Sequence, residues 1–60
     1  MVGYYVLKLD ENGNLYLYDE DGGERLVCRD IYSILDYVKS HGSGTIYVSN
    51  TIVIKGGVIR

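Results

Sequence analysis

The sequence predicts a small α+β domain, in the order β-β-β-α-β-β, with one helix packed on one face of a mostly antiparallel sheet. Glycines divide the chain into short segments rich in valine, isoleucine and tyrosine, which is typical of strands joined by tight turns. Residues 30–41 instead have the apolar spacing of an amphipathic helix. With 60 residues the chain has room for one domain only, so residues 1–60 are expected to share one core.

Residues 3–28 are expected to form a three-stranded antiparallel meander, with strands over 3–9, 15–18 and 25–28. Two loops fit the first turn. A two-residue Asn12-Gly13 turn would pair Leu9 with Tyr16, whereas a three-residue loop with Gly13 in the left-handed conformation pairs Leu9 with Leu15. We favour the three-residue loop, because only this register gathers the leucines on one face of the sheet.

The second hairpin is expected to turn at Asp21-Gly22, a favoured two-residue sequence. This turn places Leu17 opposite Leu26 and Tyr18 opposite Arg25. Because strand side chains alternate, the register assigns every strand position to one of two faces. The face under the helix is expected to carry Tyr5, Leu7, Leu9, Leu15, Leu17, Leu26, Cys28, Ile46, Val48, Ile52, Ile54 and Ile59.

The helix predicted over residues 30–41 has Asp30 as its N-cap, and Gly42 suits the left-handed position that follows a helix. Its apolar stripe consists of Ile31, Ile34, Leu35 and Val38. The crossover from residue 28 to residue 45 is long enough for the chain to return parallel. One such helix is too short to cover the whole sheet, and the opposite face has no helix at all.

Residues 45–60 are expected to form a C-terminal hairpin with strands over 45–50 and 51–55. A sixth short strand over 58–60, after a Gly56-Gly57 turn, is an open alternative. No formal charge lies between Ser40 and Ile54 if His41 is neutral, and such a segment would aggregate at an open sheet edge. We therefore expect this segment at the centre of the sheet or, as a second option, paired with another chain across an oligomer interface.

The outer face, opposite the helix, gathers most of the tyrosines and bases by the same alternation. It is expected to carry Tyr4, Val6, Lys8, Tyr16, Tyr18, Arg25, Val27, Arg29, Tyr47, Val53, Lys55 and Arg60, with Val58 beside them. None of the eight carboxylates is expected there, because the acidic residues fall in the turns and on the helix. A face of tyrosine and valine this large is too apolar to be left in water without a reason.

Three interpretations of this face compete. It could be an ordinary solvated sheet surface, it could pack on a second copy of the chain or another protein, or it could bind single-stranded nucleic acid through stacking tyrosines and basic side chains. We favour a non-catalytic interaction protein that forms a homo-oligomer, most simply a homodimer, because so small a domain lacks other supports. Single-stranded nucleic-acid binding is the alternative, although the acidic turns and the net charge of −2 speak against it.

Other function classes find little support in the sequence. One cysteine, Cys28, and one histidine, His41, cannot supply a disulfide or the ligands of a structural zinc site, so no metal or cofactor is expected. Residues 19–24 are acidic but lack the spacing of a calcium-binding loop. His41 is the only candidate base, and Ser40, Ser43 and Cys28 are nucleophiles by residue type only, so no enzyme activity and no small-molecule substrate are expected. No segment suits a signal peptide or a membrane span, so the expected location is intracellular, in the cytoplasm.

Overall fold

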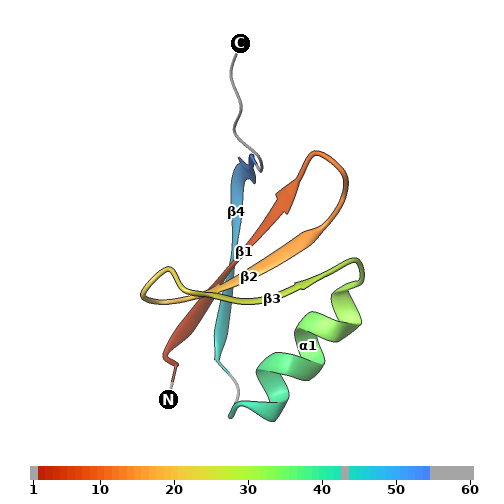
Figure 1. The fold of residues 1–60 in the computed structure, drawn as a ribbon. Helices are drawn as coiled ribbons and strands as arrows, with labels where there is room; N and C mark the ends of the chain where they lie inside the picture. The colour runs from red at the N-terminus through yellow and green to blue at the C-terminus, as the bar shows by residue number, and fades with distance from the viewer. Residues whose placement is uncertain (1, 43, 55–60) are drawn as a thin grey trace.

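The chain folds as an α+β domain with one helix on one face of a four-stranded sheet (Figure 1). The computed structural model describes residues 2–42 and 44–54. In chain order the elements are β1 (Tyr4–Asp10), β2 (Leu15–Asp19), β3 (Glu24–Cys28), α1 (Ile31–Ser40) and β4 (Thr45–Val53). The strand order in the sheet is β3-β2-β1-β4. The α+β class is therefore confirmed, whereas the described residues hold four strands instead of the predicted five or six.

The sheet is mixed, because β4 pairs parallel to β1 while the β1–β2 and β2–β3 pairs are antiparallel. The crossover through α1 does return parallel, but it passes over β2 and β1 to reach the far side of β1. Within the described residues β4 pairs with β1 alone and thus forms a sheet edge. Among the described residues, the expected central position of this uncharged segment is therefore wrong, because β4 has a strand on one side only. The second option, pairing with another chain, stays a prediction.

The C-terminal hairpin expected at residues 45–60 does not turn at residue 50, because β4 continues as one strand to Val53. Ser49 and Thr51 instead make a local bulge, in which the two hydroxyl oxygens lie 2.7 Å apart and the Thr51 amide donates to Ser49 Oγ at 3.1 Å. The register with β1 shifts at this point, between Leu7 and Leu9. The expected Gly56-Gly57 turn and the strand over 58–60 lie outside the described residues.

The first hairpin has the predicted three-residue loop. Gly13 has a φ of +85°, its amide donates to the Asp10 carbonyl oxygen at 3.3 Å, and the Asp10 amide donates to the Asn14 carbonyl oxygen at 3.1 Å. Leu9 is paired with Leu15, so the leucines share one face as expected. Glycine suits this position because other side chains rarely adopt a left-handed backbone.

The second hairpin has the same loop geometry rather than the predicted two-residue turn. Gly22 has a φ of +84° and its amide donates to the Asp19 carbonyl oxygen at 3.0 Å. The pairing of Leu17 with Leu26 is confirmed, but a register shift then places Tyr18 opposite Glu24 instead of Arg25. The longer loop, which includes residue 20, causes this one-residue shift.

The core lies between α1 and the middle of the sheet, and its buried members are Tyr5, Leu7, Leu17, Ile34 and Val38. Around them pack the half-buried side chains of Val2, Leu15, Leu26, Cys28, Tyr37 and Ile46. The helix begins after Asp30, whose carboxylate accepts a hydrogen bond from the Ser33 amide at 2.9 Å, as the N-cap prediction requires. Ile31 and Leu35 were expected in the core but are exposed, because they lie at the margin of the helix stripe.

Candidate interaction surfaces

The strand register places most of the predicted outer residues on one face of the sheet, which we call the tyrosine face. Val6 pairs with both Tyr18 and Tyr47, and Tyr16 pairs with both Lys8 and Val27. Of the residues predicted there, it holds Tyr4, Val6, Lys8, Tyr16, Tyr18, Val27, Tyr47 and Val53, and the register adds Asp10 and Glu24. The sheet thus brings together tyrosines from the first, second and last strands, as the sequence predicts.

The tyrosine rings on this face form two fixed pairs. Tyr4 and Tyr47 meet edge to face with their ring centres 5.5 Å apart, and both remain exposed. Tyr16 and Tyr18 stack with their ring centres 6.4 Å apart. Tyr16 is buried and its hydroxyl donates to Asp10 Oδ2 at 2.8 Å, so this ring is not open to a stacking base. The face therefore offers exposed apolar surface mainly at Tyr4, Tyr47 and Val27.

Two of the predicted cations are engaged elsewhere. Arg25 Nε lies 2.9 Å from Asp19 Oδ2, and its Nη1 donates to the hydroxyl of Tyr37 on the helix at 3.5 Å. The register shift beside Tyr18 explains this, because Glu24 takes the position that was assigned to Arg25.

The other engaged cation is Arg29, which follows β3 and reaches the first hairpin loop. Its Nη1 donates to Asn14 Oδ1 at 2.8 Å and its Nη2 to the Asn12 carbonyl oxygen at 3.3 Å. Lys8 remains on the tyrosine face, with Nζ 5.6 Å from the centre of the Tyr18 ring. Lys55 and Arg60 lie outside the described residues, so the predicted basic character of this face rests on Lys8 alone among the residues described.

Two aspartates hold the hairpin loops, and sequence reasoning missed both. Asp10 accepts hydrogen bonds from the amides of Asn12 and Asn14, from the Asn14 side chain and from the Tyr16 hydroxyl, at 2.8–2.9 Å. The Asn14 side chain is the largest cause that holds the Asp10 pKa well below its usual range, against the opposing effect of burial. The hydrogen bond that the Tyr16 hydroxyl donates to Asp10 raises the pKa of Tyr16. Asp10 also corrects the expectation that no carboxylate lies on this face, because it shares the alternation of Lys8.

Asp19 plays the same part in the second loop. It accepts from the amides of Asp21 at 3.0 Å and Gly23 at 2.8 Å, and from Arg25. The Gly23 amide, followed by Arg25, lowers the pKa of Asp19, and the bond to Asp19 raises that of Arg25. The sequence pattern that could have predicted both loop aspartates is the repeated Asp-Glu-x-Gly at residues 10–13 and 19–22. Because these carboxylates already accept bonds from their own loops, we assign them a structural role.

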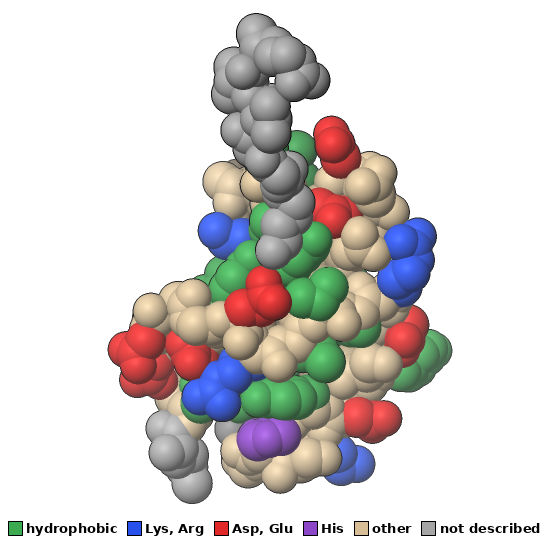
Figure 2. Space-filling model, in the orientation of Figure 1, with side chains coloured by type: hydrophobic (Ala, Val, Ile, Leu, Met, Phe, Trp, Pro, Cys, Tyr) green, Lys and Arg blue, Asp and Glu red, His purple; other side chains and the backbone are tan. Residues whose placement is uncertain are grey.

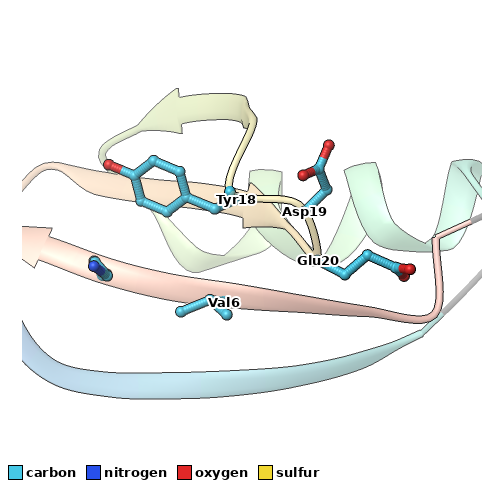
Figure 3. A pocket seen from close by; sticks show the side chains of 6 residues that line it. Val6, Tyr18, Asp19 and Glu20 are labelled. Atoms are coloured by element: carbon cyan, nitrogen blue, oxygen red, sulfur yellow. The ribbon is translucent and has the colours of Figure 1, made fainter.

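A shallow hollow of about 320 Å³ opens on the tyrosine face beside the second loop, lined by Val6, Lys8, Tyr18, Asp19, Glu20 and Gly22. Figure 3 shows Val6 and Tyr18 on neighbouring strands, with the carboxylates of Asp19 and Glu20 at the loop end. Glu20 accepts a hydrogen bond from the Gly3 amide. One lysine among two carboxylates gives this hollow no net positive charge for a phosphate group.

A second exposed apolar surface, the β4 patch, lies on the helix side of the sheet at Leu9, Val48, Ile52 and Ile54. These side chains are 44%, 73%, 59% and 79% exposed, respectively, although the sequence predicts them in the core. In Figure 1 the helix lies beside the lower part of the sheet, and the end of β4 extends beyond it. Leu35 is also exposed, on the flank of α1 opposite Tyr37.

No charged side chain belongs to the β4 patch, whereas Lys8, Asp10 and Glu24 lie on the tyrosine face. Figure 2 shows acidic side chains gathered at the turn between β2 and β3, and a basic side chain between them and the histidine. That histidine, His41, ends the helix, with Nδ1 2.8 Å from the Tyr37 carbonyl oxygen and its ring stacked on Tyr37 at 4.0 Å. A local role at the helix end accounts for both contacts.

The described part of the chain offers two surfaces and no assembled chemical site. Among residues 2–42 and 44–54, no group of three metal-ligating side chains lies close together. No helix within those residues has the length and apolar character needed to cross a bilayer. What the arrangement provides is exposed tyrosine and valine on one side of the sheet and exposed aliphatic side chains on the other, at β4. No protein-family model, curated protein or solved structure significantly matches this chain.

Proposed function

We propose that this protein is a non-catalytic interaction protein that associates with a second copy of itself through the tyrosine face. The observation that carries this proposal is the exposure of Tyr4, Val27 and Tyr47 on a sheet face that α1 does not cover. Large exposed apolar surface is typical of protein–protein contacts, and tyrosine is enriched in them. Two such faces packed together would form a sheet sandwich.

The geometry of the rings supports this use of the face. Tyr4 and Tyr47 meet edge to face, and this contact reduces the side-chain freedom that a partner must restrict when it packs on them. Tyr16 and Tyr18 form a flat, stacked base beside them. Preformed aromatic surface of this kind favours association, because the ordering cost is met within the monomer.

The nucleic-acid alternative draws less support. A single-strand platform needs open rings and free cations along one groove. Here Tyr16 is buried, and Arg25 and Arg29 bind side chains and carbonyl oxygens of their own chain. The alternative remains an outcome of the experiment below.

The experiment measures the molar mass of the protein in solution by light scattering, with and without an oligothymidylate. We expect the wild-type mass to exceed that of one chain and to fall by half in Tyr4→Asp, because a carboxylate on the face opposes its burial. Tyr32→Asp is the matched control, because Tyr32 is exposed on the helix and lies off the tyrosine face. A strictly monomeric wild type, or a Tyr4→Asp variant of wild-type mass, would refute the proposal. Salt-dependent oligothymidylate binding by such a protein would favour the alternative.

A further inference from the structure

The two edges of the sheet differ in charge. The edge strand β3 carries Glu24 and Arg25, and Arg29 follows it directly. Charged side chains of this kind protect a sheet edge from pairing with another strand. The edge strand β4 has nine residues and carries no charged side chain and no proline. Among the described residues, the outward edge of β4 is thus open and has no charge or proline to protect it, and only the bulge at residues 49–51 interrupts it.

The sequence of β4 is a palindrome in polarity about Asn50. The polar residues Ser49 and Thr51 flank Asn50. At equal distances on the two sides, the hydrophobic residue Val48 corresponds to Ile52, and Tyr47 corresponds to Val53. Beyond them, Ile46 corresponds to Ile54. An antiparallel pair related by a two-fold axis requires this property, because each residue must suit the position that mirrors its own.

We propose that two copies of this chain pair antiparallel along β4, with the two-fold axis at Asn50. Val48 then lies opposite Ile52 of the second copy, and Ile46 lies opposite Ile54, all on the helix side of the sheet. Tyr47 lies opposite Val53 of the second copy on the tyrosine face. Every apolar side chain of the strand thereby meets an apolar side chain, and the two β4 patches become continuous.

The bulge in β4 sits at the centre of this pairing. The Thr51 amide already donates to Ser49 Oγ, so these residues satisfy part of their hydrogen bonding locally. The intermolecular ladder is therefore carried by two arms, residues 46–48 and residues 52–54. Asn50 is exposed between the arms, and it faces Asn50 of the second copy across the axis.

This contact rests on the proposed function in one respect only, namely that the chain self-associates. The tyrosine face alone gives a dimer, and β4 pairing alone also gives a dimer. Two different two-fold contacts on each chain close into an assembly of four chains when their axes meet at right angles. In that closed arrangement the wild type is expected to have the mass of four chains.

The decisive test uses charge at the axis, where each residue faces its own copy. We expect Asn50→Lys and Asn50→Asp each to halve the molar mass, because like charges then oppose each other in the pair. An equimolar mixture of the two variants is expected to recover the wild-type mass, because opposite charges then meet. Recovery also shows that both variants are folded. Asn12→Lys is the matched control, because Asn12 is exposed in the first loop and does not belong to β4.

Two outcomes would overturn the β4 pairing: wild-type mass in both single Asn50 variants, or failure of the mixture to recover that mass. The Tyr4→Asp variant separates this result from the fate of the tyrosine face. If only the face associates, Tyr4→Asp is monomeric and the Asn50 variants keep the wild-type mass of two chains. If only β4 associates, the Asn50 variants are monomeric and Tyr4→Asp keeps two chains. In a chain shortened by residues 55–60, the Asn50 variants are still expected to halve the molar mass. If they no longer did so, the β4 edge would be a binding site for residues 55–60 and the proposed pairing would be wrong.

Discussion

Replacement of Ile34 by alanine tests whether the small core between α1 and the sheet holds the domain together. Ile34 is 0% exposed and packs with Tyr5 and Leu17 at the centre of the core. Truncation of a fully buried isoleucine costs about 2–5 kcal/mol, because burial is lost and a cavity remains. A domain of this length has a total free energy of unfolding of about 3–9 kcal/mol, so Ile34→Ala removes a large share of it.

The assay is urea denaturation followed by circular dichroism, at two protein concentrations so that any contribution of self-association is separated. With a urea m-value of about 1 kcal/mol/M, the midpoint of Ile34→Ala is expected to fall by about 2 M or more. Ile31→Ala is the control, because Ile31 is 42% exposed on the same helix and its loss leaves no closed cavity. The control substitution makes the same change of side chain, and it is expected to cost only about 1 kcal/mol. Equal losses in the two variants would refute the placement of the core.

Three further predictions concern the ends of the elements. Asp30→Ala is expected to cost about 1 kcal/mol in urea denaturation, because the Ser33 amide loses its cap, and Asp30→Asn should retain most of it. Gly22→Ala is expected to cost about 1–2 kcal/mol through its positive φ, since a methyl group there meets nothing within 4 Å, and equal stability of the variant would contradict this origin. The Asp10 pKa is lowered in the folded state, so the unfolded chain takes up the proton first and the wild type loses stability as pH falls below the ordinary value of 3.8. In Asp10→Asn the unfolding midpoint should change less with pH over this range than it does in the wild type. The same pH dependence in both proteins would contradict a contribution of the Asp10 carboxylate to stability.

The parts of the fold that depend on neighbouring residues were predictable from the sequence. The loop at Gly13 follows from a glycine suited to a left-handed backbone and from the demand that Leu9 and Leu15 share a face. The N-cap at Asp30 likewise follows from one residue and the amide three positions later. The error at the second hairpin has the same local origin, since Asp19 favours the longer loop through its bonds to the amides of Asp21 and Gly23.

The parts that depend on distant residues were not predictable. Nothing in the local pattern of β4 distinguishes pairing with β1 from a hairpin of its own, and the Ser49–Thr51 bulge resembles a turn in sequence. The exposure of Val48 and Ile52 follows from where α1 lies on the sheet, which alternation cannot reveal. The hydrogen-bond partners of Arg29 lie in the first hairpin loop. The residues next to Arg29 in sequence therefore could not show that its side chain lies away from the tyrosine face.

The parallel pairing of β1 with β4 also has a consequence for the order in which the chain folds. The contacts among β1, β2 and β3 join residues close in sequence, whereas Tyr4 must meet Thr45 from the other end of the molecule. Loop closure therefore favours formation of the meander first, and β4 docks only after the helix is in place. The uncharged strand β4 also follows β1, β2, β3 and α1 along the chain, so it is synthesised after them. Until β4 docks, the side of β1 that faces away from β2 is therefore unpaired and open to wrong partners.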